Sequence, residues 1–330
     1  MSSDRIQFKS RGKKGIKNLP KELTTPLDTR VSVVQEKLAQ QTGLSVNRIR
    51  LTVPPEDAGK PGPDGKKKRD IGLKADGYLK DYITAESQTI YVKDLGPQIA
   101  WRTVFLIEYF GPLVIHPVFY FFQQQIYGAH FEHSRDQQLI FVFSMLHFLK
   151  REYETAFVHK FSLATMPMFN IFKNSSHYWL LSGVLLAYFN YAPPSYFTPD
   201  APLWKRILFS RQQLLPMGET ALYGMTLFWL FSELSNFWTH ITLSNLRPPG
   251  TTVRKIPFGY GFNWVSCPNY FFETLAWTAV ALISQNWSAT LFVTVATAQM
   301  YIWALKKHRR YKKEFPDYPK NRRVYVPYLL

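Results

Sequence analysis

Cysteine is almost absent from this chain of 330 residues, which contains only Cys267. A single cysteine excludes an internal disulfide bond and any metal site built from several thiolates. Residues 1–5 also lack the apolar core of a cleavable signal peptide. We therefore expect targeting to depend on the first membrane-spanning segment.

Acidic residues are scarce relative to basic ones, with 23 Asp and Glu against 40 Lys and Arg and a formal net charge of +17. The basic excess lies in the first hundred residues, in the loops and in the tail around residues 306–313. This distribution is typical of cytosolic faces beside an anionic lipid leaflet. Because no groove-reading motif accompanies the charge, we expect a lipid bilayer as the partner of these charges, and no nucleic acid.

Long apolar runs are absent from the first hundred residues, which indicates a soluble head. Strand-like patterns occur at residues 4–10, 48–53 and 89–92. Residues 31–42 predict an amphipathic helix, with Gly43 as its C-terminal stop. The order strand, helix, strand, strand resembles a ubiquitin-like β-grasp domain. We expect that domain over residues 1–94, with residues 54–69 as a solvated loop.

Apolar segments dominate after Ile99, where the chain is expected to be embedded in a membrane. Five of them predict spans: residues 100–122, 177–191, 214–241, 271–283 and 287–305. Residues 139–172 add one or two more, and Pro167 favours a bent or re-entrant course for residues 161–172. Since the head and the tail are both basic, both termini are expected in the cytosol, which requires an even number of spans. The expected fold class for residues 95–330 is therefore a multi-pass α-helical membrane bundle of about six to seven spans, with six as the preferred count.

Glu108 lies inside the first of these apolar segments. A carboxylate within a span is rare and is by default the hypothesis of a functional site. The alternative is a glutamate that pairs with a basic residue of another helix purely for packing.

A polar stripe follows one face of residues 214–241. Glu233, Asn236 and His240 are spaced by three and four residues, and Arg247 would extend the stripe by two turns before Pro248 stops the helix. Amide, imidazole and guanidinium groups on one face suit a phosphate-bearing ligand that enters from the polar side. The alternative is a snorkelling arginine and a histidine satisfied within the bundle.

The segment 266–273 joins a basic loop to an apolar run. If a helix starts at Pro268, Asn269 and Glu273 lie one turn apart on one face, with Tyr270 close to that face. A phenol, an amide and a carboxylate at the mouth of an apolar segment are costly unless they are used. The alternative is a tyrosine of the interfacial aromatic belt beside a capping asparagine.

Two further patterns lie near this segment. The Gly259-Tyr260-Gly261 triplet has no third glycine and no preceding βαβ unit, so it does not predict a Rossmann nucleotide site. His308 and Tyr311 share one face of the last apolar segment, where it becomes basic.

Together these strings closely resemble the very-long-chain trans-2-enoyl-CoA reductases of the steroid 5α-reductase superfamily. The matching strings are residues 93–98, 108–109, 157–162, 246–250, 267–270 with Glu273, and 307–309 with Tyr311, Tyr318 and Pro319. The resemblance covers nearly the whole chain, because this family also has a ubiquitin-like N-terminal domain.

The resemblance implies the NADPH-dependent reduction of a trans-2-enoyl-CoA to the saturated acyl-CoA, the last step of fatty-acid elongation at the endoplasmic reticulum. It implies that Tyr270 is the proton donor or the donor to the enolate oxygen. It implies that Glu108 is also catalytic, either orienting the phenol or binding the nicotinamide amide. It implies that the cofactor is bound by Asn236, His240, Arg247, Asn269, Glu273, His308 and Tyr311. Other fatty-acid elongation enzymes are the implied partners.

Two other functions are compatible with the residues alone. One is the reduction of a steroid or polyprenol enone by another member of the superfamily; steroid reductases tend to have Phe at the position of Tyr270, which favours the enoyl-CoA. The other is a non-catalytic membrane scaffold whose ubiquitin-like head recruits partners.

Overall fold

The computed structural model describes residues 4–12, 14–55, 70–84, 88–161, 164–209, 218–246, 248 and 254–329. The chain divides into two compact units. The first comprises Met1–Ala100 and Leu163–Asn170, and the second comprises Trp101–Ser162 and Ile171–Leu330.

The first unit is built on a five-stranded mixed sheet with the order β2-β1-β5-β3-β4. Its strands are β1 (Asp4–Ser10), β2 (Glu22–Thr25), β3 (Ile49–Val53), β4 (Ile71–Gly72) and β5 (Thr89–Asp94). The central pair β1 and β5 is parallel, and the other pairs are antiparallel. Helix α1 (Val31–Thr42) and the short turns η1 (Val46–Arg48) and η2 (Leu79–Asp81) complete the unit.

Helix α1 contributes one apolar face to the core of this unit. Val31, Val34 and Leu38 are fully buried in the same cluster as Ile6 and Ile90 of the sheet. The helix ends at Gly43, which adopts a φ of 70° and donates its N–H to the carbonyl of Ala39. The predicted helix, its glycine stop and the three predicted strands are confirmed.

The two edge strands β2 and β4 were not predicted. β2 is a short polar segment with one buried residue, Thr25, and β4 is only two residues long. Their extended conformation comes from pairing with β1 and β3, so the local pattern carries little signal. The predicted loop at residues 54–69 lies almost entirely outside the described residues.

A two-stranded antiparallel ladder joins β6 (Gln98–Ala100) to β7 (Thr165–Pro167). The prediction of a bent course for residues 161–172 missed β7 and the start of α5 (Asn170–Ser176). The strand is specified by its partner: Met166 is buried and pairs with Ile99.

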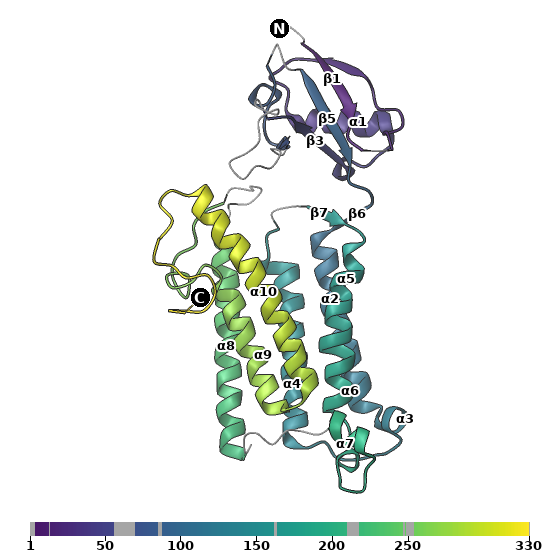
Figure 1. The fold of residues 1–330 in the computed structure, drawn as a ribbon, viewed down its shortest axis with the longest axis vertical. Helices are drawn as coiled ribbons and strands as arrows, with labels where there is room; N and C mark the ends of the chain where they lie inside the picture. The colour runs from purple at the N-terminus through teal and green to yellow at the C-terminus, as the bar shows by residue number, and fades with distance from the viewer. Residues whose placement is uncertain are drawn as a thin grey trace. The chain divides into compact units, whose positions relative to one another are not determined.

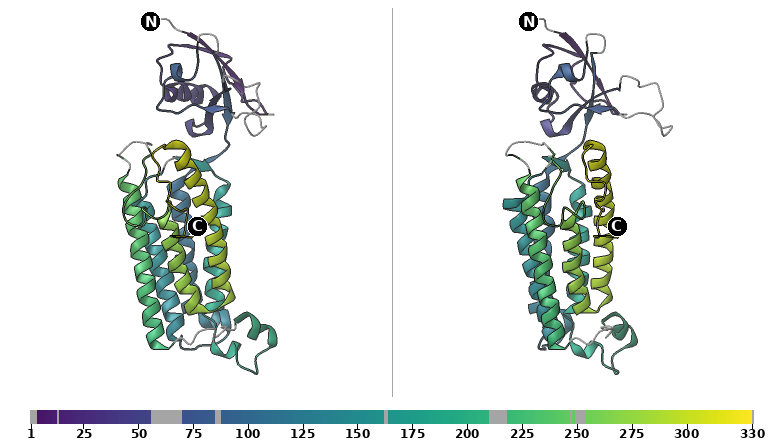
Figure 2. Two further views of the ribbon diagram at one scale, coloured as in Figure 1. Left: turned by 60° about the vertical axis from the view of Figure 1, so that its left-hand side comes forward. Right: turned by 90° about the vertical axis from the view of Figure 1, so that its left-hand side faces the viewer.

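The second unit is a bundle of long helices that run alongside one another (Figures 1 and 2). They are α2 (Trp101–Phe121), α4 (Arg135–Tyr153) with η3 (Glu154–Val158), α5 with η4 (His177–Leu185) and α6 (Leu186–Asn190), α8 (Glu219–Asn245), α9 (Pro268–Ser284) and α10 (Trp287–Glu314). Shorter elements are α3 (Gln123–Tyr127), η5 (Pro194–Tyr196) and α7 (Leu203–Phe209). α9 packs against both α8 and α10. A helix beginning at Pro268 is confirmed.

Stacked aromatic rings fill the middle of the bundle. Phe143 of α4 lies parallel to Trp229 of α8 with ring centroids 4.2 Å apart. Trp277 of α9 meets Phe292 of α10 edge-on at 4.7 Å. Among the described residues, α2 and α10 are the helices long and apolar enough to cross a membrane by themselves. Large exposed apolar side chains, such as Leu227 of α8, lie on the outside of the bundle.

Gly111 allows α2 and η4 to approach each other closely. A Cβ atom at this position would lie 2.0 Å from the indole Nε1 of Trp179, whose N–H donates to the carbonyl of Ile107.

We expect Gly111→Ala to destabilise the bundle by about 1–3 kcal/mol, because the indole has to leave its position. Thermal unfolding in detergent measures the effect. Gly224→Ala on α8, where the added Cβ meets nothing within 4 Å, is the control and should not be destabilising. Equal melting temperatures for the two variants would contradict this account of the packing.

Candidate functional site

Helix α4 introduces three basic side chains into the bundle. Lys150 and Arg151 follow His147 by three and four residues, so both lie on the helix face of His147. Their side chains are only 2, 17 and 11% exposed. Charges this deeply buried need partners, because desolvation of an unpaired ion costs several kcal/mol.

Carboxylates of α8 and α9 neutralise the first two of these groups. His147 Nδ1 lies 2.6 Å from Glu233 Oε1, and its Nε2 lies 3.3 Å from Glu273 Oε1. Both carboxylates lie within ion-pair distance of the ring, but Nε2 makes no hydrogen bond among the described residues. Lys150 Nζ lies 2.5 Å from Glu233 Oε2. Lys150 also donates to Asn236 Oδ1 at 2.6 Å.

Asn236 links α8 to the beginning of α9. Its Nδ2 donates to the carbonyl oxygen of Asn269 at 2.8 Å and to Glu273 Oε2 at 3.0 Å. The predicted shared face of Asn269 and Glu273 is therefore the face that meets α8.

Arg151 is neutralised within its own helical run. Its Nη1 donates to Glu154 Oε2 at 2.5 Å, and Glu154 Oε1 lies 3.0 Å from His240 Nδ1. The Nη2 of Arg151 donates to the Tyr109 hydroxyl at 2.8 Å, with the guanidinium over that ring. We call this set of residues the α4 network: Tyr109, His147, Lys150, Arg151, Glu154, Glu233, Asn236, His240 and Glu273.

Three residues of this region are close enough to hold a metal ion. The ligand atoms of Glu154, His159 and His240 lie within 4.8 Å of one another. The guanidinium of Arg151, however, contacts both Glu154 and His240, at 2.5 and 3.3 Å. A fixed positive charge in contact with two of the three ligands disfavours a cation, so we regard these residues as part of an ion-pair network.

Glu108 borders the α4 network on α2. It is 1% exposed and interacts with Asn174 and Arg151. Within the described part of the chain, its Oε2 has no hydrogen-bond partner. Buried polar atoms are nearly always hydrogen-bonded, so an unpaired carboxylate oxygen can accept a hydrogen bond from a ligand.

Tyr270 faces a different neighbour, α10. Lys307 Nζ lies 4.6 Å from the centre of the Tyr270 ring, and the Trp303 ring lies 6.3 Å away. The carbonyl oxygen of Tyr270 accepts a hydrogen bond from the Tyr325 hydroxyl at 3.2 Å. No hydrogen bond, ion pair or ring contact among the described residues joins Tyr270 to Glu108, so the two predicted catalytic residues have separate sets of neighbours.

His308 and Tyr311 gather at a third position, around Tyr318. His308 Nδ1 and the Tyr318 hydroxyl each lie 2.6 Å from Ser266 Oγ. Tyr311 stacks on Tyr318 with centroids 5.4 Å apart. The shared face of His308 and Tyr311 is therefore confirmed. Arg247 lies outside the described residues.

The sequence pattern did not single out the basic face of α4. The charged residues of this face stand at helical spacing: His147, Lys150, Arg151 and Glu154. Because they follow an apolar stretch, however, they look like the polar end of that segment. The same spacing test that found the stripe on α8 would have found them. The stripe of Glu233, Asn236 and His240 is mainly satisfied by these α4 residues.

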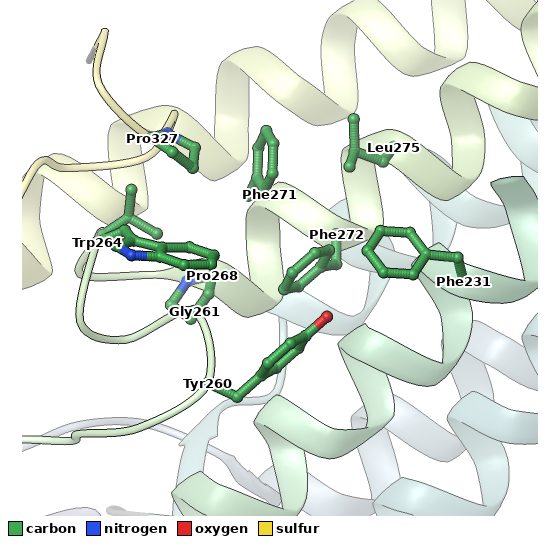
Figure 3. Close-up of a pocket in the computed structure, with 10 residues that line it drawn as sticks. Phe231, Tyr260, Gly261, Trp264, Pro268, Phe271, Phe272, Leu275 and Pro327 are labelled. Carbon is green, nitrogen blue, oxygen red and sulfur yellow. The ribbon is translucent and has the colours of Figure 1, made fainter.

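An apolar pocket of about 320 Å³ lies beside the start of α9. Figure 3 shows Phe231 of α8, Phe272 of α9 and Tyr260 of the preceding loop with their rings close together. The Tyr260 ring is parallel to the Phe272 ring at 5.5 Å, and its hydroxyl lies 2.7 Å from Ser235 Oγ. The other lining residues are Gly261, Trp264, Val265, Pro268, Phe271, Leu275 and Pro327.

Loss of a carboxylate should cost far more stability inside the α4 network than at an exposed ion pair. Glu154 is completely buried against Arg151 and His240, so Glu154→Gln leaves buried positive charge unpaired and should cost about 3–5 kcal/mol of stability. The matched control is Glu314→Gln, because Glu314 is 36% exposed and pairs with Arg254 at 2.8 Å. We expect that change to cost less than about 1 kcal/mol. Thermal unfolding in detergent compares the two, and a Glu154→Gln variant as stable as the control would rule out the proposed neutralisation of Arg151.

The comparisons with known proteins cover both halves of the chain. Residues 164–330 match the family described as 3-oxo-5-alpha-steroid 4-dehydrogenase. The chain is 46% identical to a candidate enoyl reductase of Schizosaccharomyces pombe, over 98% of this chain and 99% of the relative. It is 41% identical to a very-long-chain enoyl-CoA reductase of Dictyostelium discoideum, over 93 and 94% of the two chains. A Caenorhabditis elegans protein with a similar name is 39% identical over 91% of each chain. The chain therefore belongs to the very-long-chain enoyl-CoA reductase family, within the 3-oxo-5-alpha-steroid 4-dehydrogenase group.

Proposed function

We propose that this chain catalyses the NADPH-dependent reduction of trans-2-enoyl-CoA to saturated acyl-CoA, the last step of the very-long-chain fatty-acid elongation cycle. The observation that carries the proposal is the similarity, over nearly the full length, to a protein named very-long-chain enoyl-CoA reductase. The steroid name belongs to a family that matches only residues 164–330. A steroid or polyprenol substrate and a non-catalytic scaffold are therefore not favoured.

The side chains present fit a nicotinamide dinucleotide. The buried Oε2 of Glu108 can accept a hydrogen bond from a carboxamide. The last turns of α10 expose lysine and arginine side chains near His308 and Tyr311, and these suit phosphates. Asn236, His240, Asn269 and Glu273 take part in internal contacts, so we propose that they hold the cofactor site in shape and contact it at its edge. Arg247 completes the proposed set from the sequence pattern.

The reduction needs an acid next to the substrate. NADPH, when bound, supplies the hydride that reduces C3 of the enoyl thioester. Negative charge then develops on the thioester oxygen, and C2 has to receive a proton. We assign Tyr270 to this step, either as the proton donor or as the hydrogen-bond donor to the oxygen, because a phenol is protonated at neutral pH. Glu108 has no described contact with Tyr270, so we assign it to the cofactor amide.

The architecture of the proposal has three parts. The first unit has the parallel β1–β5 pair at the centre of the order β2-β1-β5-β3-β4, which supports a ubiquitin-like β-grasp domain over residues 1–94. In the described part of the second unit, six long helical runs support six membrane spans in a reductase domain over residues 95–330. We further propose residence in the endoplasmic reticulum membrane with both termini in the cytosol, next to other fatty-acid elongation enzymes.

A direct test uses the purified full chain in detergent with NADPH and trans-2-hexadecenoyl-CoA. The proposal expects NADPH oxidation with this substrate and none with a steroid enone. Tyr270→Phe should lower kcat by about a hundredfold or more, the range found for general acids, while NADPH affinity stays close to that of the wild type. The control is Tyr301→Phe, which removes the hydroxyl of another tyrosine that packs in the same apolar cluster as Tyr270. This variant should remain active. Wild-type turnover by Tyr270→Phe would overturn the assignment of the acid.

The pocket beside α9 is the candidate for the distal part of the acyl chain. Its lining is apolar, and Pro268 and Phe271 on its wall flank Asn269 and Tyr270 in the sequence. At about 320 Å³ it lies at the lower end of the range for ligand sites, enough for part of a long chain.

Filling this pocket should therefore discriminate between substrates by length. We expect Leu275→Trp to lower kcat/KM for trans-2-hexadecenoyl-CoA about tenfold, roughly the effect of two buried methylene groups at about 0.8 kcal/mol each, with little change for trans-2-hexenoyl-CoA. Leu227→Trp places the same bulk on an exposed position of α8 as the control. An equal loss with both substrates, or none with either, would exclude the pocket as an acyl site.

A further inference from the structure

Lys307 differs from the other basic residues in the last turns of α10. Its side chain is exposed, like those of its neighbours in the basic run. Its ammonium, however, lies 4.6 Å from the centre of the Tyr270 ring on α9. To reach this position, the aliphatic stem of Lys307 extends back toward the bundle, where the ammonium makes a cation–π contact with Tyr270.

The surroundings of this contact contain few other charges. Cys267 and Tyr325 are 1 and 3% exposed and pack with Tyr270 in one cluster, together with Tyr301. On α10, Lys307 also interacts electrostatically with Tyr311. Glu273, one turn further along α9, is occupied by His147 and Asn236. Among the described residues, Lys307 is thus the cation in contact with the Tyr270 ring.

We propose that Lys307 is a positioning residue for Tyr270: its ammonium fixes the phenol and stabilises the phenolate that remains after proton donation. The inference rests on the proposed function. When hydride has reached C3, the electron pair of the enolate forms a new C–H bond at C2 with the Tyr270 proton. The O–H electron pair stays on the Tyr270 oxygen, and solvent later returns the proton. The negative charge therefore moves from the substrate to an oxygen close to the Lys307 ammonium, where opposite charges attract.

The experiment compares Lys307→Gln, Lys307→Arg and the control Lys205→Gln, which removes an ammonium 3.7 Å from the Tyr196 ring, in the full chain with NADPH and trans-2-hexadecenoyl-CoA. We expect Lys307→Gln to lower kcat about tenfold, within the contribution of general acid catalysis, with NADPH Kd unchanged. Loss of the ammonium leaves the negative charge on the Tyr270 oxygen without its neighbouring cation, so the loss should fall on kcat and not on KM for trans-2-hexadecenoyl-CoA. Lys307→Arg should restore most of the lost kcat, and the control should keep the wild-type kcat.

A second comparison separates this role from a structural one. In a Tyr270→Phe background, Lys307→Gln should cause no further loss of kcat, because the ammonium acts through the phenol. An unchanged kcat in Lys307→Gln, no rescue by Lys307→Arg, or an equal further loss in the Tyr270→Phe background would overturn the inference. Should Lys307→Gln prove unstable, Lys307→Met keeps the apolar stem and serves the same test. Wild-type turnover by Tyr270→Phe would instead defeat the proposed mechanism itself, so the two failures are distinguishable.

Discussion

The neutralisation of the buried charges of α4 is the interaction on which the arrangement of the bundle depends. Lys150 and Arg151 lie among apolar helices, where an unpaired charge is far more costly than a lost packing contact. Their carboxylate partners come from α8 and from η3, and His147 adds a second link to α9. Apolar surfaces alone tolerate sliding of one helix along another. Ion pairs with short distances do not, so they fix the register of α4, α8 and α9.

This register also determines what the other face of α9 can do. Asn269 and Glu273 are held toward α8 and α4 by Asn236 and His147. Tyr270 therefore projects toward α10 and meets Lys307. The α4 network and Tyr270 are coupled through α9, although no hydrogen bond or ring contact joins them among the described residues. A change in α4 can thus alter the position of Tyr270 without touching it.

Local signals in the sequence were sufficient where one segment specifies its own structure. The helix that ends at Gly43 and the helix that begins at Pro268 follow from spacing and from the conformational preferences of those residues. β2 and β7 adopt strands because a partner is present, so their own residues carry little information. The same limit applied to the site. The stripe on α8 was visible, but its counter-ions on α4 were not recognised, because pairing across helices is a property of the fold.

The counter-ions change the meaning of the stripe. Glu233, Asn236 and His240 are required by His147, Lys150 and Glu154 whether or not a ligand binds, so their polarity by itself is no evidence for a cofactor. The stronger evidence comes from groups that the described fold does not use fully. Two such groups are the Oε2 atom of Glu108 and the exposed basic side chains at the end of α10. A hydrogen-bond acceptor within the bundle and cations at the end of α10 suit the amide and the phosphates of the proposed cofactor. We therefore propose that the cofactor lies between these two positions.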